Sequence, residues 1–380
     1  MNPVYTKLGT TIFEATSARA RATGAINLGQ GFPDGRGPED VLAEAARALV
    51  EESNQYPPMA GTPALRQAVA DHYRVHQGLD FAVEEVIVTS GATEALACAI
   101  FALVSPGDEV VLFQPLYDAY LPLVERAGGV AKLVPLEPPH WRITADALAA
   151  VASERTRLIL VNTPLNPAGT LLTQEERALL ADFCISHDAI AICDEVWEHV
   201  VFDGAEHRSL IAELGMRERT VKIGSAGKIF SLTGWKVGWM CAAPRLAAVL
   251  AKAHQFMTFT TPPNLQAGAA YGLRKDRAYF TDMRAGYQRS RDRLAAGLTG
   301  LGYTVLPCAA TYFLNIDLAA SGVAMGDVAF AEWLIEEAGV ATIPVSAFYA
   351  EAPVTNVVRL CFAKQDATLD AALERMMRRP

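Results

Sequence analysis

Lys228 and Lys236 are the only charged residues in the segment SAGKIFSLTGWKVGW, residues 225–239. A lysine amine is nucleophilic when it is neutral, and burial or a neighbouring cation favours the neutral form. The small residues before Lys228 leave room for a planar ligand. The pattern therefore indicates a reactive amine at Lys228, with Ser225 and Lys236 offering a hydroxyl and a positive charge to an anionic group.

Two further candidates lie where expected strands end. Thr89 ends one such strand, small residues follow, and the expected helix at 93–104 then begins. The N–H groups at a helix start suit a phosphate, although an ordinary cap by Thr89 or Ser90 is the better explanation of this junction alone. Asp194 ends the run AIAICD, where a carboxylate is costly to bury unless it is paired. It could hold a protonated ring nitrogen, or equally well act as a helix cap or salt-bridge partner.

The segment VNTPLNPAGT holds Asn162 and Asn166 on a loop that Pro164 and Pro167 make stiff. Their amides can point at a ligand, or bond only to the backbone of a turn. Arg359 stands among apolar residues in VVRLCF. A guanidinium suits bidentate carboxylate binding, and an edge-strand arginine facing water is the alternative.

Taken together, these groups fit one ligand. A phosphate site, a carboxylate for a pyridinium, amides for a phenolic oxygen and an isolated lysine describe pyridoxal 5′-phosphate (PLP). Arg359 is then left for a substrate carboxylate. We therefore predict PLP as the cofactor, bonded covalently through Lys228.

The rest of the chain predicts an α/β fold. Helical spacing covers 41–53 and 63–77, and short β-branched runs then alternate with helix-like stretches at 93–104 and 173–187. Such alternation predicts a mostly parallel sheet covered by helices on both faces, with ligands bound outside the carboxyl ends of the strands. A smaller α+β unit is expected from a charged helix at 282–300 onward. The β-branched runs expected to form the strands of the large sheet are 85–89, 108–113, 157–163, 189–195 and 220–225.

Composition excludes several classes of function. The chain has 380 residues, of which 51% are hydrophobic, and a net charge of −9 without a basic run. We expect no nucleic-acid or membrane partner, and no signal-peptide pattern opens the chain. The six cysteines are scattered without a C-x-x-C pair, as expected of free thiols in a reducing cytoplasm. We predict a cytoplasmic protein without a metal.

The motifs also resemble a known family. INLGQGFPD, NQY, NTPLNP, CDEVW, SAGKIFSLTGWKVGW and VVRLCFAKQDATL follow one another over nearly the whole chain. In this the chain is similar to the fold-type I, class I/II PLP-dependent aminotransferases, and most similar to their kynurenine–oxoglutarate transaminase / glutamine transaminase K branch. The resemblance implies an N-terminal arm with part of the small domain (1–40), a large PLP-binding domain (41–280) and a C-terminal small domain (281–380).

The resemblance also implies residue roles. Lys228 is the Schiff-base lysine and proton shuttle, Asp194 pairs the pyridine nitrogen, and Tyr56 reaches the cofactor of the second subunit in a homodimer. The other cofactor contacts implied are Ala92, Thr93, Tyr117, Asn162, Asn166, Trp197, Ser225 and Lys236. The substrate contacts implied are Arg359, Gly31, Asn166, Phe13, Phe259, Thr260 and Tyr312.

Two residues depart from the family pattern. Trp197 stands where most relatives have a tyrosine that donates to the ring oxygen, and Thr93 stands where the animal relatives have an aromatic residue. The function expected is ping-pong transfer of the amino group of an L-amino acid, of aromatic, sulfur-containing or glutamine-like type, to a 2-oxo acid. The alternatives are a β-lyase acting on cysteine conjugates, another specialised PLP reaction, or a non-catalytic PLP-binding regulator. The regulator is disfavoured because the motifs begin by residue 26, leaving no room for a DNA-binding domain.

Overall fold

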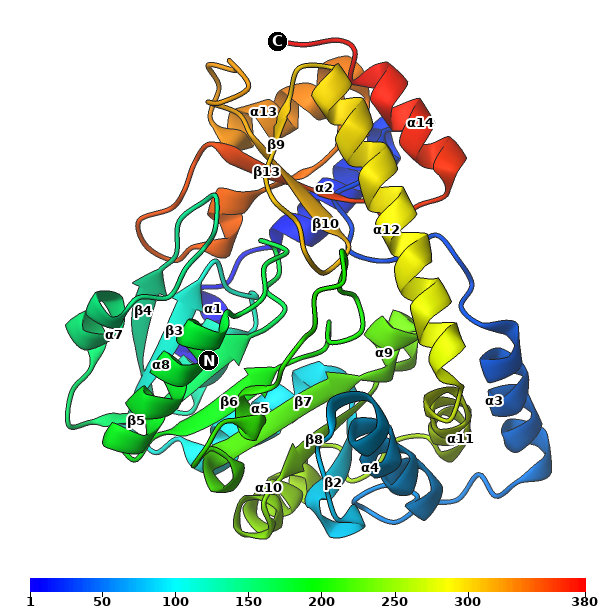
Figure 1. The fold of residues 1–380 in the computed structure, drawn as a ribbon, viewed down its shortest axis with the longest axis vertical. Helices are drawn as coiled ribbons and strands as arrows, with labels where there is room; N and C mark the ends of the chain where they lie inside the picture. Colours follow the sequence, from blue (N-terminus) through cyan, green and yellow to red (C-terminus); the bar gives the residue numbers. More distant parts are fainter.

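The computed structural model describes all residues, 1–380, and its largest feature is a seven-stranded sheet (Figure 1). The strand order is β2-β8-β7-β6-β5-β3-β4, and only β8 runs antiparallel to its neighbours. This confirms the predicted α/β class with a mostly parallel sheet. The strands are β2 (Val86–Ser90), β3 (Glu109–Gln114), β4 (Val130–Pro135), β5 (Thr156–Asn162), β6 (Ile190–Asp194), β7 (Thr220–Ser225) and β8 (Val237–Ala242).

Both faces of this sheet are buried, because successive strand residues point to opposite sides. In β5, Leu158 and Leu160 join the core beneath α5 (Gly91–Leu103) and α10 (Pro244–Met257), whereas Ile159 and Val161 join the core beneath α8 (Gln174–Ser186). A third cluster beneath α4 (Pro63–Gln77) and α11 (Pro263–Leu273) takes the alternate residues of β2 and β8. The long β-branched runs of the sequence are therefore strands that have no polar face.

Two strands were missing from the sequence prediction. β4 is the edge strand and its residues are mostly half-buried or exposed, so VAKLVP has a weak strand pattern. β8 follows Lys236 at once, and its residues VGWMCA contain Gly238 and Trp239 in place of a β-branched run. The predicted helices at 41–53, 63–77, 93–104 and 173–187 all occur, with ends displaced by two residues or fewer.

A second sheet, with strand order β12-β13-β10-β9, is antiparallel throughout. β1 pairs in parallel with β11, which brings α2 (Ile12–Thr23) and β1 beside the last third of the chain (Figure 1). The strands are β1 (Ile26–Asn27), β9 (Thr304–Val305), β10 (Phe313–Asp317), β11 (Val340–Ala341), β12 (Ile343–Pro344) and β13 (Val357–Cys361).

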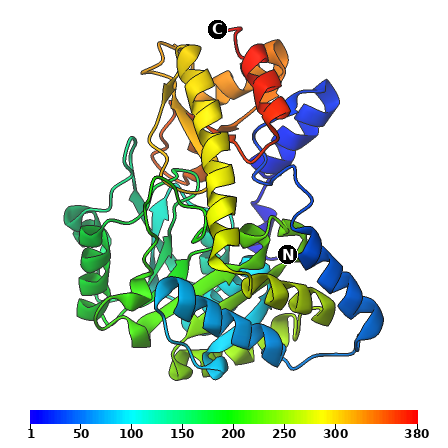
Figure 2. The ribbon, with the colours of Figure 1, turned by 45° about the vertical axis from the view of Figure 1, so that its right-hand side comes forward.

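The long helix α12 (Arg277–Gly300) links the two sheets, running from α11 to the side of α14 (Figure 2). No helix combines the length and the apolar character needed to cross a lipid bilayer. The other helices are α1 (Pro3–Thr6), α2 (Ile12–Thr23), α3 (Glu39–Glu51), α4 (Pro63–Gln77), α5 (Gly91–Leu103), α6 (Tyr120–Arg126), α7 (Ala145–Val151), α8 (Gln174–Ser186), α9 (Ala226–Ile229), α10 (Pro244–Met257), α11 (Pro263–Leu273), α13 (Asp327–Trp333) and α14 (Asp366–Arg375).

Candidate active site

The carboxyl ends of the parallel strands meet at one edge of the large sheet. Asn162 pairs with Asp194 across β5 and β6, and Ser225 at the end of β7 pairs with Gly238 of β8. A cavity of about 210 Å³ opens at this edge. All the residues predicted to contact the cofactor line it, except Tyr56. The lining is Gly91, Ala92, Thr93, Leu96, Tyr117, Tyr120, Asn162, Asn166, Asp194, Val196, Trp197, Ser225, Gly227, Lys228, Thr233 and Lys236.

The Lys228 amine lies in this cavity without an ion-pair partner. Its Nζ is 4.7 Å from the centre of the Trp197 ring, and the short helix α9 carries it. Burial lowers the pKa of Lys228 to about 8, with smaller effects in the same direction from Arg359 and Lys236, while Asp194 acts the other way. A large part of this amine is therefore neutral near pH 8 and able to attack an aldehyde. Lys236 helps to keep the amine neutral, but burial is the larger cause.

Asp194 is the buried acid of the site, and it meets a residue that the sequence prediction missed. The Tyr120 hydroxyl donates to Asp194 Oδ2 at 2.6 Å. Burial raises the pKa of Asp194, and the Tyr120 hydrogen bond acts against that rise. Tyr120 follows Tyr117 by three residues in QPLYDAY, a spacing that places both side chains near one another when a helix begins there.

The start of α5 forms the anion end of the cavity. Ser90 makes no side-chain cap, so the ordinary cap interpretation does not account for this helix start. Gly91 has φ +72°, and a Cβ there would lie 3.2 Å from Lys236 Cε and 3.3 Å from its Nζ. Lys236 donates to Thr93 Oγ1 at 3.4 Å. Uncapped helix N–H groups beside an ammonium are a donor set that fits a phosphate.

The amides on the 161–170 loop have different partners. Asn162 bonds only to backbone, donating to the Asp194 carbonyl at 2.9 Å and accepting from the Asn166 N–H at 2.8 Å. The turn interpretation therefore describes Asn162, although its side chain also lines the cavity. Asn166 Oδ1 accepts a hydrogen bond from Arg359 at 2.9 Å. This bond connects the cofactor cavity to the arginine predicted to bind the substrate carboxylate.

Arg359 lies in β13, between β12 and β10, and is 1% exposed. The alternative of a water-facing edge-strand arginine is therefore wrong. Its two terminal nitrogens donate to Asn166 and to the Gly29 carbonyl at 2.9 and 2.8 Å, and its Nε has no partner. Burial lowers the pKa of Arg359 to about 10. No carboxylate of the chain pairs with it, so this buried cation can accept one from a ligand.

Aromatic rings surround the guanidinium. Its carbon lies 3.8 Å from the centre of Phe313, 5.1 Å from that of Phe348 and 5.3 Å from that of Phe13. The Tyr312 hydroxyl donates to the Gly31 carbonyl at 2.6 Å. Phe348 and Phe313 were not among the predicted site residues, because neither lies in a motif that carries chemistry.

Seven predicted residues do not line this cavity: Arg359 and its neighbours Phe13, Gly31 and Tyr312, and, in another part of the chain, Tyr56, Phe259 and Thr260. Tyr56 is 82% exposed and packs edge-on against Phe259, with ring centres 5.5 Å apart. Thr260 follows Phe259, and its hydroxyl is buried without a partner. Tyr56 and Phe259 therefore form an exposed aromatic pair outside the cavity.

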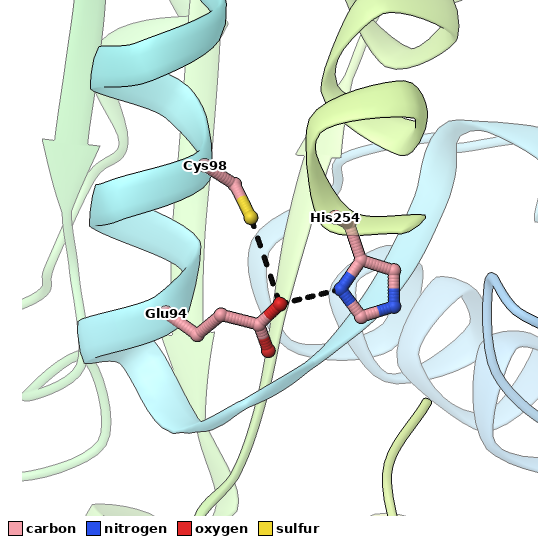
Figure 3. Close-up of side chains that lie close together, drawn as sticks. All are labelled: Glu94, Cys98 and His254. Atoms are coloured by element: carbon pink, nitrogen blue, oxygen red, sulfur yellow. Dashed lines mark hydrogen bonds and ion pairs between the residues drawn. The ribbon is translucent and has the colours of Figure 1, made fainter. Parts of the chain in front are cut away.

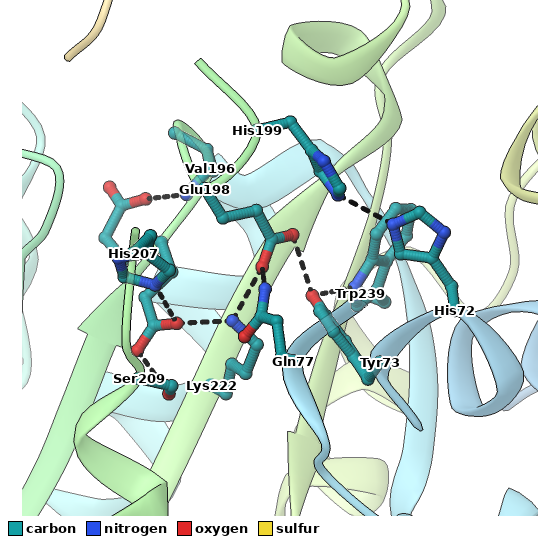
Figure 4. Close-up of polar contacts among 12 residues, drawn as sticks. His72, Tyr73, Gln77, Val196, Glu198, His199, His207, Ser209, Lys222 and Trp239 are labelled. Atoms are coloured by element: carbon teal, nitrogen blue, oxygen red, sulfur yellow. Dashed lines mark hydrogen bonds and ion pairs between the residues drawn. The ribbon is translucent and has the colours of Figure 1, made fainter. Parts of the chain in front are cut away.

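A larger cleft of about 830 Å³ opens beside α4, α12 and residues 198–213, and it contains none of Lys228, Asp194 or Arg359. Beside it is a buried ion cluster (Figure 4). Lys222 donates to Glu195 and, at 2.7 Å, to Glu198, and His207 lies 2.8 Å from Glu195. Burial raises the pKa of Glu195, but Lys222 and His207 lower it to about 2. Because an ammonium already occupies the two carboxylates, the cluster is structural.

One pair of histidines with metal-ligand spacing was overlooked in the prediction of no metal. His72 and His76 are four residues apart on α4, with ring centres 4.3 Å apart. His72 already uses both nitrogens, Nδ1 with the Leu273 carbonyl at 3.1 Å and Nε2 with His199 at 2.7 Å. The pair therefore contributes packing and hydrogen bonds to this part of the core.

A second polar cluster supports the first turn of α5 (Figure 3). Glu94 accepts from the Ser90 N–H, from Thr258 at 2.7 Å and from His254 Nδ1 at 2.6 Å. His254 also contacts the Met59 carbonyl at 2.9 Å through Nε2. This pair ties the helix start to α10 and to the loop after Tyr56.

Glu94→Gln should destabilise the protein most between about pH 4.5 and 6.5. Burial lowers the pKa of His254, but Glu94 raises it above its usual 6.5. Burial raises the pKa of Glu94, but His254, with the Ser90 N–H and Thr258, lowers it below its usual 4.5. The contribution of His254 to folding stability is full below pH 6.5 and is lost as the pH rises through its raised pKa. The contribution of the Glu94 carboxylate is present above pH 4.5 and is lost as the pH falls through its lowered pKa. Thermal unfolding from pH 5 to 9 should give a loss of about 1.5–3 kcal/mol near pH 6 that shrinks at pH 9. Exposed Glu125→Gln is the control, and a loss that did not vary with pH would contradict the ion pair.

Comparisons with known proteins agree with this geometry. The family model described as aminotransferase class I and II matches residues 23–376. The chain is 42% identical over 371 residues to methionine aminotransferase of Escherichia coli, covering 97% of this chain and 96% of that one. It is 42% identical to the probable N-succinyldiaminopimelate aminotransferase DapC of Mycobacterium tuberculosis (97% and 95% covered) and 34% identical to human kynurenine–oxoglutarate transaminase 1 (92% and 91% covered). The solved structure of the Escherichia coli enzyme superposes with a TM-score of 0.96, at 41% identity over 99% of both chains.

Proposed function

Because this chain belongs to the class I and II aminotransferase family and is a PLP-dependent aminotransferase, we propose that its amino donor is an L-amino acid with an aromatic, sulfur-containing or glutamine-like side chain. The observation that carries this proposal is the setting of Arg359. One buried cation is available for the α-carboxylate, and three phenyl rings stand around it. Thioether and aromatic side chains pack well against such rings.

The positions of the site residues support the roles proposed for them. PLP, when bound, supplies an electron-withdrawing ring that stabilises negative charge at the substrate Cα. Lys228 would hold the cofactor and, as a neutral amine, would move the proton from Cα. Asp194 would hold a proton on the ring nitrogen. Arg359 orients the substrate through its α-carboxylate, and Lys236 with the start of α5 binds the phosphate.

A donor with a second carboxylate is disfavoured by the cations of this chain. Lys228 and Lys236 are the only cations that line the cavity, and both have roles at the cofactor. Arg359 serves the α-carboxylate. The relatives named for methionine and for kynurenine have donors of the proposed class, whereas N-succinyldiaminopimelate carries additional charge.

A panel of amino donors tests this proposal. Methionine, phenylalanine, kynurenine and glutamine should react with 2-oxo acids at kcat/KM values at least about tenfold above aspartate, which is the scale at which pockets discriminate apolar side chains. The readout is the new amino acid formed from the acceptor. Pyruvate and ammonia are measured separately, because they would report β-elimination of a cysteine conjugate. Exclusive use of aspartate or of N-succinyldiaminopimelate would contradict the donor class.

The assembly proposed is a homodimer with shared sites in the cytoplasm. Exposed aromatic side chains support it, because Tyr56 is 82% exposed and contacts Phe259, and Phe256 is 84% exposed. All six cysteines are free thiols, which accords with a reducing compartment. The proposed domains are the arm (1–40), the large domain (41–280) and the small domain (281–380).

A further inference from the structure

We propose that Tyr120 is the positioning residue for Asp194: its hydroxyl holds one carboxylate oxygen, so that the other meets the ring nitrogen of the cofactor. This inference rests on the proposed roles of the site residues. Tyr120 is 2% exposed and Asp194 is 5% exposed, and their 2.6 Å contact closes the wall of the cavity. It joins the start of α6 to the end of β6.

The contact is directional. The hydrogen bond to Asp194 is the only one that the Tyr120 hydroxyl makes. Asp194 Oδ1 receives only a long 3.5 Å contact from the Val196 N–H. One oxygen is therefore held firmly and the other keeps its capacity to accept. Burial raises the pKa of Tyr120 well above its usual value, so the hydroxyl remains a donor at every working pH.

A donor at this position favours the ionised carboxylate. A short O–H···O⁻ bond is charge-assisted and stabilises the ion more than the acid. The titratable and charged groups near Asp194 are Tyr117, Tyr120, Cys193, Glu195 and Lys228. Of these, the Lys228 amine is no longer a free cation once it is bonded to the cofactor, and the negative charge of Glu195 disfavours a second negative charge on Asp194. Tyr120 is then the neighbouring side chain that continues to stabilise the anion in the working enzyme.

The test is Tyr120→Phe in the holoenzyme. A hydrogen bond to a charged group of this strength corresponds to about a 10- to 100-fold fall in kcat, with KM changed by less than about threefold. The acid limb of the kcat profile, and the absorbance titration of the bound cofactor, should both move upward by about one to two pH units. The absorbance readout does not depend on turnover.

Controls separate positioning from a general loss of packing. Tyr349→Phe removes a hydroxyl of the same kind, which donates to the Leu136 carbonyl at 2.6 Å outside the cavity, and its acid limb should stay in place. In an Asp194→Asn background, Tyr120→Phe should cost less than about threefold, because its target is no longer an anion. A fall in kcat without movement of the titration, or full additivity of the two variants, would overturn the proposal.

The outcomes also distinguish this inference from the proposed function. If the wild-type protein retains the cofactor on Lys228 but prefers aspartate as donor, the donor class fails while the absorbance titration still tests Tyr120. If the donors behave as expected and the titration of Tyr120→Phe matches that of wild type, only the positioning role fails.

Discussion

Lys228→Ala should reduce transamination by at least about 10⁴-fold. The variant loses both the amine that holds the cofactor and the group that moves the Cα proton, and proton transfer alone typically contributes 10²- to 10⁴-fold. The amine lies in the cavity with a pKa of about 8, so its neutral form is available near neutral pH. The measurement is single-turnover absorbance together with borohydride reduction and mass spectrometry of the peptide that contains residue 228.

Two controls accompany this variant. Exposed Lys252→Ala should keep both the activity and the adduct. Lys236→Ala should keep the adduct but weaken retention of the cofactor, because Lys236 lies at the anion end near Thr93. Turnover at the wild-type level in Lys228→Ala, or an adduct on another lysine, would refute the assignment.

Arg359→Ala should lower kcat/KM for amino acids by roughly 30- to 5,000-fold, the range expected when one partner of a buried charge pair is removed, at about 2–5 kcal/mol. The side chain is buried and its bonds go to Asn166 and to the Gly29 carbonyl, so the substrate carboxylate is the expected counter-charge. Arg359→Lys should lie between alanine and wild type, since it keeps the charge and loses the planar fork.

The decisive comparison is between each amino acid and its decarboxylated amine. Wild type should prefer the amino acid strongly, and Arg359→Ala should lose that preference, while exposed Arg378→Ala should keep it. If Arg359→Ala discriminated between methionine and its amine as well as wild type does, the carboxylate would bind elsewhere.

The sequence by itself determined the chemistry and the class of fold. Lys228, Asp194 and Arg359 stand out because each is a charged residue in an apolar stretch, and such a residue needs a partner or a ligand. The strands were recognisable where both faces are buried, as in β5 and β6, because long β-branched runs signal that burial. β4 and β8 escaped prediction because an edge position and small residues weaken the pattern.

Only the tertiary structure decided which groups meet. Tyr120 and Asp194 are 74 residues apart, and Arg359 and Asn166 are 193 apart. Strand pairing and the packing of the two sheets bring them together, and no local pattern encodes such distances. The three rings around Arg359, the full burial of its guanidinium and the lowered pKa of Lys228 likewise depend on what surrounds each side chain. Residue type specified what each group can do, and packing specified its neighbours and its charge, because desolvation is a property of the folded chain.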